Sequence, residues 1–440
     1  MYHSQLGEVA VDSNIETRVM RKVSIRLVPL ITVLYFIAYI DRTNLGFAAL
    51  TMNQALGFSP KVFGFGASLF LVGYVLFQLP GNLLFDKYGA RRMTAAIAFL
   101  WGLCASGMAW IWDDMSFYTV RLLLGVAEAA FIPGMLYYIS QWFPTAYRGR
   151  IIAIFMVANP LSNAVGFPLS ALLMLMDGTW GIAGWRWVFL LEGWPAVFLS
   201  AVVLVYMTER PADARWLSPD ERQWLTGAME ADIAARPLAR SVRGTWGAFT
   251  NLRAWILALG YFCIMIGLYG YNLWLPQIVK KFGLTITATG MVSAIPYLAV
   301  APFMLYWGRR MDKSGDRGWY AASACILGCA GFMGSAVVDS PFLALISLTV
   351  AAMGFYAGMS CYWTIVTWLF SGTTAAVCIA LVGSVGHLGG IAGSYFMGFM
   401  RQTMGNFTLG LVGLGIPLIV AGLIALAFRH SKKEGVPDTA

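Results

Sequence analysis

Apolar stretches of about 20 residues recur along the whole chain, separated by short charged or Gly- and Pro-containing links. An apolar helix of this length spans the roughly 30 Å hydrocarbon core of a bilayer. Hydrophobic residues make up 59% of the chain and charged residues only 12%, which is too few to cover a water-compatible surface. The pattern predicts an all-α integral membrane protein with twelve transmembrane helices. The expected spans are 26–47, 62–84, 93–112, 116–138, 150–175, 187–208, 253–278, 287–308, 319–338, 341–366, 373–398 and 406–428.

Lysine and arginine are distributed unevenly over the links between these spans. If both chain ends are cytoplasmic, 23 of the 30 basic residues fall on the cytoplasmic side, and five fall outside: Lys61, Arg186, Lys280, Lys281 and Arg401. The positive-inside rule therefore predicts a multi-pass protein of the cell inner (plasma) membrane with both termini in the cytoplasm. Because the net charge of +9 is spread over loops that face anionic lipid, we expect no nucleic-acid partner.

A long hydrophilic stretch, residues 209–252, separates six expected spans from six. It divides the chain into a cytoplasmic N-terminal segment (1–25), a first six-helix bundle (26–208), a cytoplasmic interdomain linker (209–252), a second six-helix bundle (253–428) and a cytoplasmic tail (429–440). Within the linker, Ser218 followed by Pro219 predicts the start of a helix.

A short charged motif follows the second span and again the eighth span. The first copy reads NLLFDKYGARR over residues 82–92, and the second reads GRRMDKSGDR over residues 308–317. Each contains an acid, a lysine, a glycine two positions later and then arginine. A glycine at the turn lets an acidic side chain cap or contact a neighbouring helix end. Two copies a half-chain apart indicate an internal repeat.

With this motif in both halves, the sequence resembles the major facilitator superfamily over nearly its whole length. The resemblance implies two pseudo-symmetric six-helix bundles around a central substrate cavity that opens alternately to each side of the membrane. The first copy departs from the family signature, because Asn82 stands where a glycine is usual. The residues expected to form the conformational gate are Asp86, Lys87, Gly89, Arg91, Arg92, Gly308, Asp312, Lys313, Gly315 and Arg317.

Three further segments resemble one branch of that superfamily, the anion:cation symporters. They are YIDRTNLGFA in the first span, RLLLGVAEAAFIPG in the fourth and GWRWVFLLEGWPA leading into the sixth. Relatives in this branch carry galactonate, hexuronates, tartrate, phthalate or hydroxyphenylacetate, and the bacterial ones mostly couple uptake to protons. The resemblance implies a secondary transporter rather than an enzyme, with no cofactor and no metal. The expected partners are a small organic anion, protons rather than sodium, and membrane lipid, with the chain acting as a monomer.

Charged residues inside the expected spans are candidates for function, since a charge in the hydrocarbon layer is costly. Asp41 and Arg42 lie at about the same depth as Arg121, and Glu128 lies deeper on the stripe that Arg121 and Gly125 share. Guanidinium groups bind carboxylates bidentately, so we expect Arg42 and Arg121 to bind substrate. Glu128 and Asp41 are the expected proton carriers, because a low dielectric favours the neutral acid. The alternative is ion pairing that only holds helices together.

Polar and aromatic residues near the centres of other spans are weaker candidates for substrate contacts. They are Tyr39, Asn44, Tyr74, Tyr271, Asn272, Gln277, Trp363 and His387. Aromatic groups also anchor at membrane interfaces or fill packing, which is the alternative interpretation. His387 stands where the family usually has Asn, so it could bond a carboxylate, titrate or only pack the helix. Glu192, within the GWRW segment, is interpreted as structural.

The expected function is import of an organic carboxylate with protons by alternating access. The missing eleventh-span Asn and the many aromatics favour a planar or aromatic acid such as phthalate or hydroxyphenylacetate, and leave hydroxy dicarboxylates such as tartrate open. An exporter or drug antiporter of the same fold is an alternative, although NPLSNAVGFPLS in the fifth span lacks the Gly-Pro dipeptide of drug antiporters. A membrane sensor is a further alternative.

Overall fold

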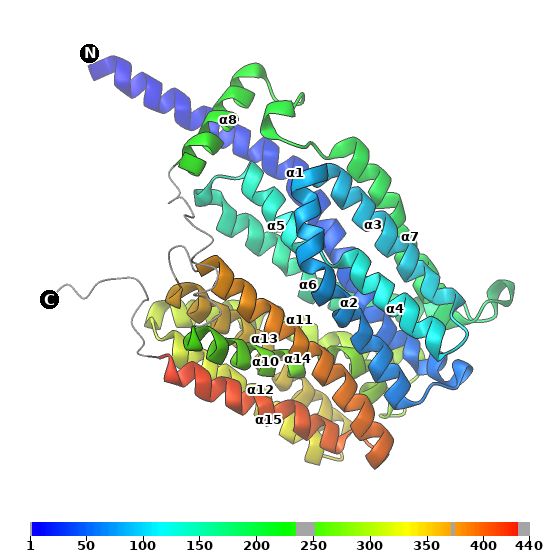
Figure 1. Cartoon of the computed structure of the whole chain (residues 1–440). Helices are drawn as coiled ribbons and strands as arrows, with labels where there is room; N and C mark the ends of the chain where they lie inside the picture. Colours follow the sequence, from blue (N-terminus) through cyan, green and yellow to red (C-terminus); the bar gives the residue numbers. More distant parts are fainter. Residues whose placement is uncertain (1, 235–250, 371–374, 430–440) are drawn as a thin grey trace.

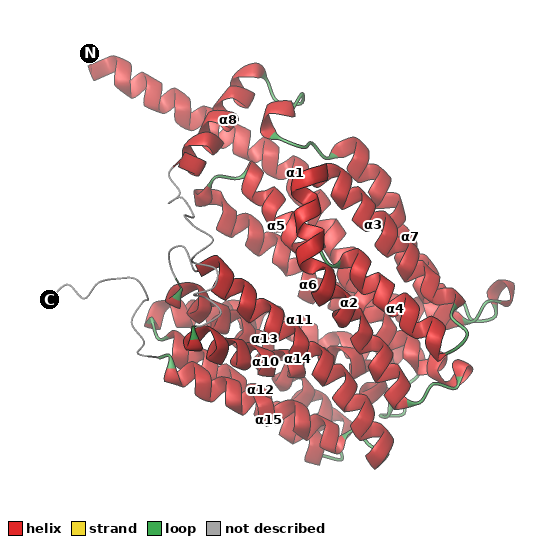
Figure 2. Ribbon diagram, viewed as in Figure 1, coloured by secondary structure: helices red, strands yellow, loops and turns green. Residues whose placement is uncertain are grey.

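The computed structural model describes residues 2–234, 251–370 and 375–429, and these residues form helices and connecting loops without a strand (Figures 1 and 2). Twelve helical segments are long and apolar enough to cross a membrane, which confirms the predicted number and the all-α membrane class. The first half contains α1 (Tyr2–Leu56), α2 (Pro60–Tyr88), α3 (Ala90–Gly107), α4 (Asp114–Glu128), α5 (Phe131–Trp142), α6 (Thr145–Met174) and α7 (Gly184–Tyr206). After α8 (Pro219–Ala234), the second half contains α10 (Leu252–Lys280), α11 (Ile286–Ser314), α12 (Arg317–Val337), α13 (Pro341–Leu369), α14 (Ala375–Met404) and α15 (Thr408–Ala427).

Side chains just before the helices satisfy the first backbone N–H groups and so fix where the helices begin. Ser59 accepts a hydrogen bond from the N–H of Val62 at the start of α2, where Pro60 occupies the first helical turn. Thr285 accepts in the same way from Ala288 at the start of α11. These caps place the α1–α2 and α10–α11 turns at equivalent positions in the two halves.

The outer surface of the helices carries many large apolar side chains. Leu79 is 71% exposed, Phe198 is 70% exposed and Val205 is 87% exposed. Such a surface is unfavourable in water and favourable against lipid tails. Together with the twelve long apolar helices, it identifies a multi-pass membrane protein.

Glycines let helices of the second half approach one another closely. A Cβ atom built on Gly389 or Gly393 of α14 would lie 2.9 Å from the backbone carbonyl carbon of Phe262 or Ile266 of α10. No side chain fits at such a distance, so α14 packs on α10 through bare backbone. The small-residue spacing of α14 therefore allows close contact between these two helices.

The two halves of the chain contact each other at the end of the molecule that lies away from the termini. Gly64 of α2 lies against Gly398 of α14, and the backbone N–H of Lys61 donates to the side-chain oxygen of Gln402 at 3.1 Å. Gly290 of α11 lies against Ala171 of α6. Toward the termini, Figure 1 shows the helices of the two halves diverging. The two halves therefore pack together at one end and separate toward the other.

The helix α8 is fixed to the first half of the molecule by charge pairs. Ser218 and Glu221 form reciprocal hydrogen bonds at its start, which confirms the predicted helix start. Glu221 also accepts from Lys22 of α1 at 2.7 Å and pairs with Arg18 at 3.0 Å. Residues 235–250 of the linker and residues 430–440 of the tail lie outside the described residues.

Candidate functional site

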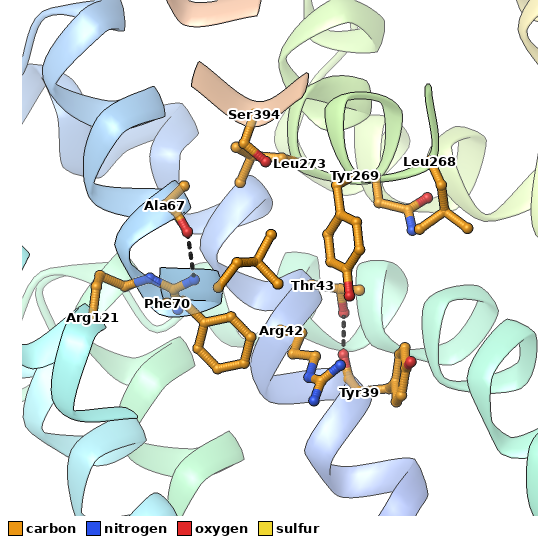
Figure 3. Close-up of a pocket in the computed structure, with 12 residues that line it drawn as sticks. Tyr39, Arg42, Thr43, Ala67, Phe70, Arg121, Leu268, Tyr269, Leu273 and Ser394 are labelled. Carbon is orange, nitrogen blue, oxygen red and sulfur yellow. Dashed lines mark hydrogen bonds between the residues drawn. The ribbon is translucent and has the colours of Figure 1, made fainter. Parts of the chain in front are cut away.

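A pocket lies between the two halves of the molecule, near the middle of the long helices (Figure 3). The space that protein atoms leave unfilled there is about 560 Å³ when the part open to solvent is included, and about 60 Å³ of it can hold the centre of a water molecule. Five helices, α1, α2, α4, α10 and α14, supply its lining, so its shape depends on how the two halves sit together. The lining residues are Tyr39, Arg42, Thr43, Ala67, Phe70, Leu71, Arg121, Leu268, Tyr269, Asn272, Leu273 and Ser394.

Arg42 is neutralised by Glu128 at the edge of this pocket. The Nε and Nη2 groups of Arg42 both lie close to Oε1 of Glu128, at 2.8 and 2.6 Å. Both side chains are buried, and the guanidinium also lies about 5 Å from the rings of Tyr39, Phe70 and Tyr74. An ion pair removed from water in this way is strongly held, and breaking it would leave an unpaired buried charge.

Arg121 lines the same pocket and has a different environment. It is 4% exposed, and the hydrogen bond recorded for its guanidinium is a long one, at 3.4 Å to the carbonyl oxygen of Ala67. No carboxylate within the part of the chain that the structure describes forms an ion pair with it. The ring of Phe70 lies between the two arginines, 4.9 Å from Arg121 and 5.2 Å from Arg42 (Figure 3). The pocket therefore presents one arginine held in an ion pair and one that forms no ion pair within the described chain.

The fourth span is broken directly after Glu128, where α4 ends and α5 begins at Phe131. Pro133 explains the break, because it has no N–H to offer the carbonyl of Ala129 and its ring would clash there. Before the break, Gly125 lets α4 lie close to α2. A Cβ atom on Gly125 would lie 2.8 Å from the carbonyl carbon of Phe70. The local sequence thus places Arg121 and Glu128 on a short helix pressed against the pocket wall.

Asp41 points away from the pocket, into the packing between α1, α3, α6 and α7. Its carboxylate accepts from the indole Nε1 of Trp101 at 2.8 Å and from the amide of Asn44 at 3.5 Å. Glu192 of α7 lies next to this group, beside Asn44, and accepts from the hydroxyl of Ser170 at 2.8 Å. We call Asp41, Asn44, Trp101, Ser170 and Glu192 the Asp41 cluster. It contains a predicted proton carrier, Asp41, and a glutamate whose sequence context predicts a structural role, Glu192.

The remaining predicted contacts divide between the pocket and other places. Tyr39 and Asn272 line the pocket, whereas Tyr74 stacks on His387 at its margin, with 5.4 Å between the ring centroids. His387 itself lies 2.8 Å from the backbone oxygen of Gly383, measured from its Nδ1 atom.

Three of the predicted contacts pack elsewhere. Tyr271 donates to the carbonyl of Leu348 inside the second half, and Gln277 accepts from Arg401 at the end where the two halves meet. The ring of Trp363 packs edge-on against Tyr261, at 5.0 Å. None of these three is among the residues that line the described pocket.

Several pocket residues had no clear signal in the sequence. Phe70, Thr43 and Ser394 are ordinary residues of apolar spans, and only the packing of helices from both halves brings them to the pocket. Glu192 is different, because an ionisable residue inside a span is itself a signal of function.

The repeated charged motif forms turns whose glycines adopt positive φ, at 83° for Gly89 and 71° for Gly315. After Gly89, the carboxylate of Glu209 receives the N–H groups of Ala90 and Arg91 at the start of α3. After Gly315, Asp316 caps α12 and pairs with Arg429 at 2.5 Å. The acids that cap helices here are therefore Glu209, from outside the motif, and Asp316, rather than Asp312.

The other motif residues lie at the surface or beside it. Lys87, Arg92, Asp312 and Lys313 are exposed, Gly308 has open space around it, and the guanidinium of Arg317 lies 5.5 Å from the ring of Trp368. The side chain of Asp86 lies outside the described residues.

Comparison with known proteins identifies relatives that match the chain over nearly its whole length. The sequence pattern of the Major Facilitator Superfamily matches residues 31–394. A protein of Agrobacterium vitis, provisionally named as a tartrate transporter, is 43% identical over 96% of this chain and 98% of its own length. A protein of Acinetobacter baumannii named "Quinolone resistance transporter" is 37% identical over 95% of this chain and 96% of its own. Among solved structures, a D-xylose-proton symporter superposes with a TM-score of 0.74 at 16% identity, covering 93% of this chain and 99% of that one.

Proposed function

Because the chain belongs to the major facilitator superfamily, whose members are transporters and not enzymes, we propose that it imports an organic carboxylate with protons by alternating access. The observation that carries the proposal is the state of Arg121. A buried guanidinium without an acidic partner in the described chain is costly unless an anion from outside completes it. A substrate carboxylate in the pocket would supply that charge.

Of the acid classes expected from the sequence, a dicarboxylate fits this pocket best. Two guanidinium groups face the pocket across the ring of Phe70, so an anion with two carboxylates can address both. The tyrosine hydroxyls and the Asn272 amide around them suit a substrate that also carries hydroxyl groups. The name of the Agrobacterium relative agrees with a hydroxy dicarboxylate. Aromatic carboxylates such as phthalate are the next class to test.

Proton coupling follows from the pairing of Arg42 with Glu128. While Glu128 is ionised it neutralises Arg42, and a second carboxylate gains little by approaching. Adding a proton to Glu128 releases the guanidinium, which can then bind the substrate. Substrate and proton would thus enter the site together, and neither alone would balance its charges.

The arrangement of the two halves suits a state that is open to the cytoplasm. The contacts between them involve the α1–α2 and α14–α15 ends, which the positive-inside rule assigns to the outer face. The termini and α8 would then lie in the cytoplasm, beside the diverging ends of the helices. Release of an imported substrate would take place from this state.

Export is the second candidate function, and the Acinetobacter relative is the observation that favours it. An exporter of the same fold would use the same charged pocket with an opposite cycle. A cation-lined pocket selects for anions, however, and an uncharged or cationic drug would leave Arg121 without a partner.

The deciding experiment is uptake by purified protein in liposomes under an imposed pH gradient. We expect accumulation of tartrate or another dicarboxylate when the outside is acidic, dissipation of the gradient in step with uptake, and competition by phthalate if aromatic acids also bind. Glu128→Gln should bind and exchange substrate without concentrating it. If no carboxylate accumulates and a quinolone moves against the proton gradient, the chain is an exporter.

A further inference from the structure

The Asp41 cluster holds two carboxyl groups and no cation. Asp41 is 2% exposed and Glu192 is 3% exposed. Neither forms an ion pair with a lysine or arginine in the described chain, since Arg42, the nearest basic residue in sequence, is taken by Glu128. The hydrogen-bonding neighbours are neutral, namely Asn44 from α1, Trp101 from α3 and Ser170 from α6, and the further charge that acts on Asp41 is the negative one of Glu128 on α4. Two ionised carboxylates cannot coexist in such a setting.

The wider balance of charge gives the same result. Across the pocket and the cluster there are three carboxyl groups, Asp41, Glu128 and Glu192, and two guanidinium groups, Arg42 and Arg121. The carboxyl groups therefore outnumber the guanidinium groups by one. With one proton on Asp41 or Glu192, the cluster keeps a single negative charge, while the pocket keeps the single positive charge of Arg121 that a substrate anion would neutralise.

Hydrogen bonds indicate which of the two carboxyl groups carries that proton. Both oxygens of Asp41 accept hydrogen bonds, from Trp101 at 2.8 Å and from Asn44 at 3.5 Å, which favours the ionised form. Oε1 of Glu192 accepts from Ser170, while its Oε2 forms no well-aligned hydrogen bond among the described residues, although the side chain of Asn44 lies beside it. The side-chain oxygen of Asn44, the residue beside Glu192, also lacks a donor. A proton on Oε2 supplies a donor where the cluster otherwise holds unmatched acceptors.

We propose that Glu192 is a second proton-binding site, which holds one proton beside ionised Asp41 within the first half of the molecule and outside the substrate pocket. That this proton travels with substrate rests on the proton coupling proposed above. Since Asp41 and Arg42 are adjacent on α1, a movement of Arg42 toward a substrate would carry Asp41 with it and alter its contacts to Asn44 and Trp101. Glu192 would then exchange its proton as the pocket fills.

Infrared spectroscopy of the purified protein tests the site without relying on transport. The carbonyl stretch of a protonated carboxylic acid should be present in the wild type, absent in Glu192→Gln and retained in Asp41→Asn. Ser170→Ala, which removes the donor to Oε1, should shift that band without removing it. Because glutamine reproduces the shape of the neutral acid, Glu192→Gln should fold with an unchanged Tm. If the carbonyl band of the wild type is unchanged in Glu192→Gln, Glu192 is ionised and the proposal is wrong.

Transport measurements in liposomes separate this proposal from the proposed function. If Glu192 binds a transported proton, Glu192→Gln should keep exchange of substrate at equal concentrations on both sides and move one proton fewer per substrate. A band assigned to Glu192 in a protein that transports no carboxylate would leave the site standing and overturn the proposed function. An unchanged proton ratio in Glu192→Gln would show that its proton stays in place, against the coupling role.

Discussion

At the scale of single residues, the two pocket arginines differ in what surrounds them. Arg42 is locked to Glu128 at 2.6 Å, while Arg121 has the ring of Phe70 and a long bond to a backbone carbonyl. The planar guanidinium of Arg121 can form two parallel hydrogen bonds to a carboxylate, which an ammonium group cannot. Arg121 is therefore where affinity for the substrate anion should be most sensitive to side-chain shape.

We predict that Arg121→Lys raises the KM for substrate about tenfold, equivalent to about 1.4 kcal/mol, because one of two charge-assisted bonds is lost. Uptake kinetics in liposomes measure this. Arg310→Lys is the matched control, since Arg310 bonds Tyr306 on the exposed side of α11 and should leave KM unchanged. An Arg121→Lys protein with wild-type KM would remove Arg121 from the binding site.

The residue scale also marks the limit of what the sequence reveals about the site. Asp41, Arg42, Arg121 and Glu128 stand out because a charge inside an apolar span is rare. Which of them pair cannot be read from helical depth, since depth places Arg42 level with Arg121 while its ion-pair partner is Glu128. Pairing depends on side-chain rotamers and on the rotation of each helix about its axis, and neither leaves a periodic trace in the sequence.

At the scale of helices, the pocket depends on the close packing of α4 on α2. Gly125 makes that possible, and the break after Glu128 lets α4 tilt independently of α5. The sequence predicts the stripe that Arg121, Gly125 and Glu128 share, but the expected span 116–138 is continuous, so the break before Pro133 is a finding of the structure. The number of helices is predicted, because the length of each apolar run reflects the bilayer thickness.

We predict that Gly125→Ala lowers the free energy of unfolding by about 1–3 kcal/mol, because the added methyl would lie 2.8 Å from the carbonyl carbon of Phe70 and 3.0 Å from the N atom of Tyr74. Transport should fall with it, since Arg121 and Glu128 move with α4. Thermal unfolding followed by tryptophan fluorescence measures the change. Gly149→Ala in α6 is the control, because its added methyl meets nothing within 4 Å. Equal Tm values for the two variants would contradict the prediction.

The attachment of α8 to α1 should weaken in acid. The hydrogen bond from Lys22 lowers the pKa of Glu221, aided by the N–H of Ser218 and the charge of Arg18. A lowered folded-state pKa stabilises the protein above the ordinary glutamate value, about 4.3, and this contribution is lost as the pH falls through the folded-state pKa. We therefore expect Tm to fall on acidification below about pH 4.3, and to fall less in Glu221→Gln. Identical slopes for both proteins in that range would contradict the assignment.

At the scale of the whole molecule, the two halves are held together at one end by contacts that leave no room for side chains. A Cβ on Gly398 would lie 3.2 Å from both the Cα of Gly64 and the ring of Trp274. The twofold repeat of the sequence predicts two bundles, but it does not predict which end is closed. That choice reflects a small free-energy difference between two packings of the same residues.

We predict that Gly398→Leu disfavours this packing. The protein should shift toward a state that is open at the end where Gly64 and Gly398 now meet. A cysteine in place of Ala67, which lines the pocket, should then react faster with a membrane-impermeant maleimide. The maleimide is added from the side of the α1–α2 and α14–α15 turns. Gly107→Leu, at the same end of the molecule but with open space around it, should leave the rate unchanged. Equal labelling of both variants would mean that the Gly64 and Gly398 contact does not hold the halves together.

The unbroken length of α1 has a mechanical consequence. One helix runs from Tyr2 to Leu56, with the Glu221 contacts at Arg18 and Lys22 and the pocket charge at Arg42. Between Arg18 and Arg42 it extends about 36 Å, at 1.5 Å per residue, as one helix that continues through Pro29. Any tilt of α1 that accompanies substrate binding is magnified at its far end. A fluorescent label at that end, far from the substrate, would be displaced when the pocket fills. The labelled protein would then report substrate binding through a change in fluorescence.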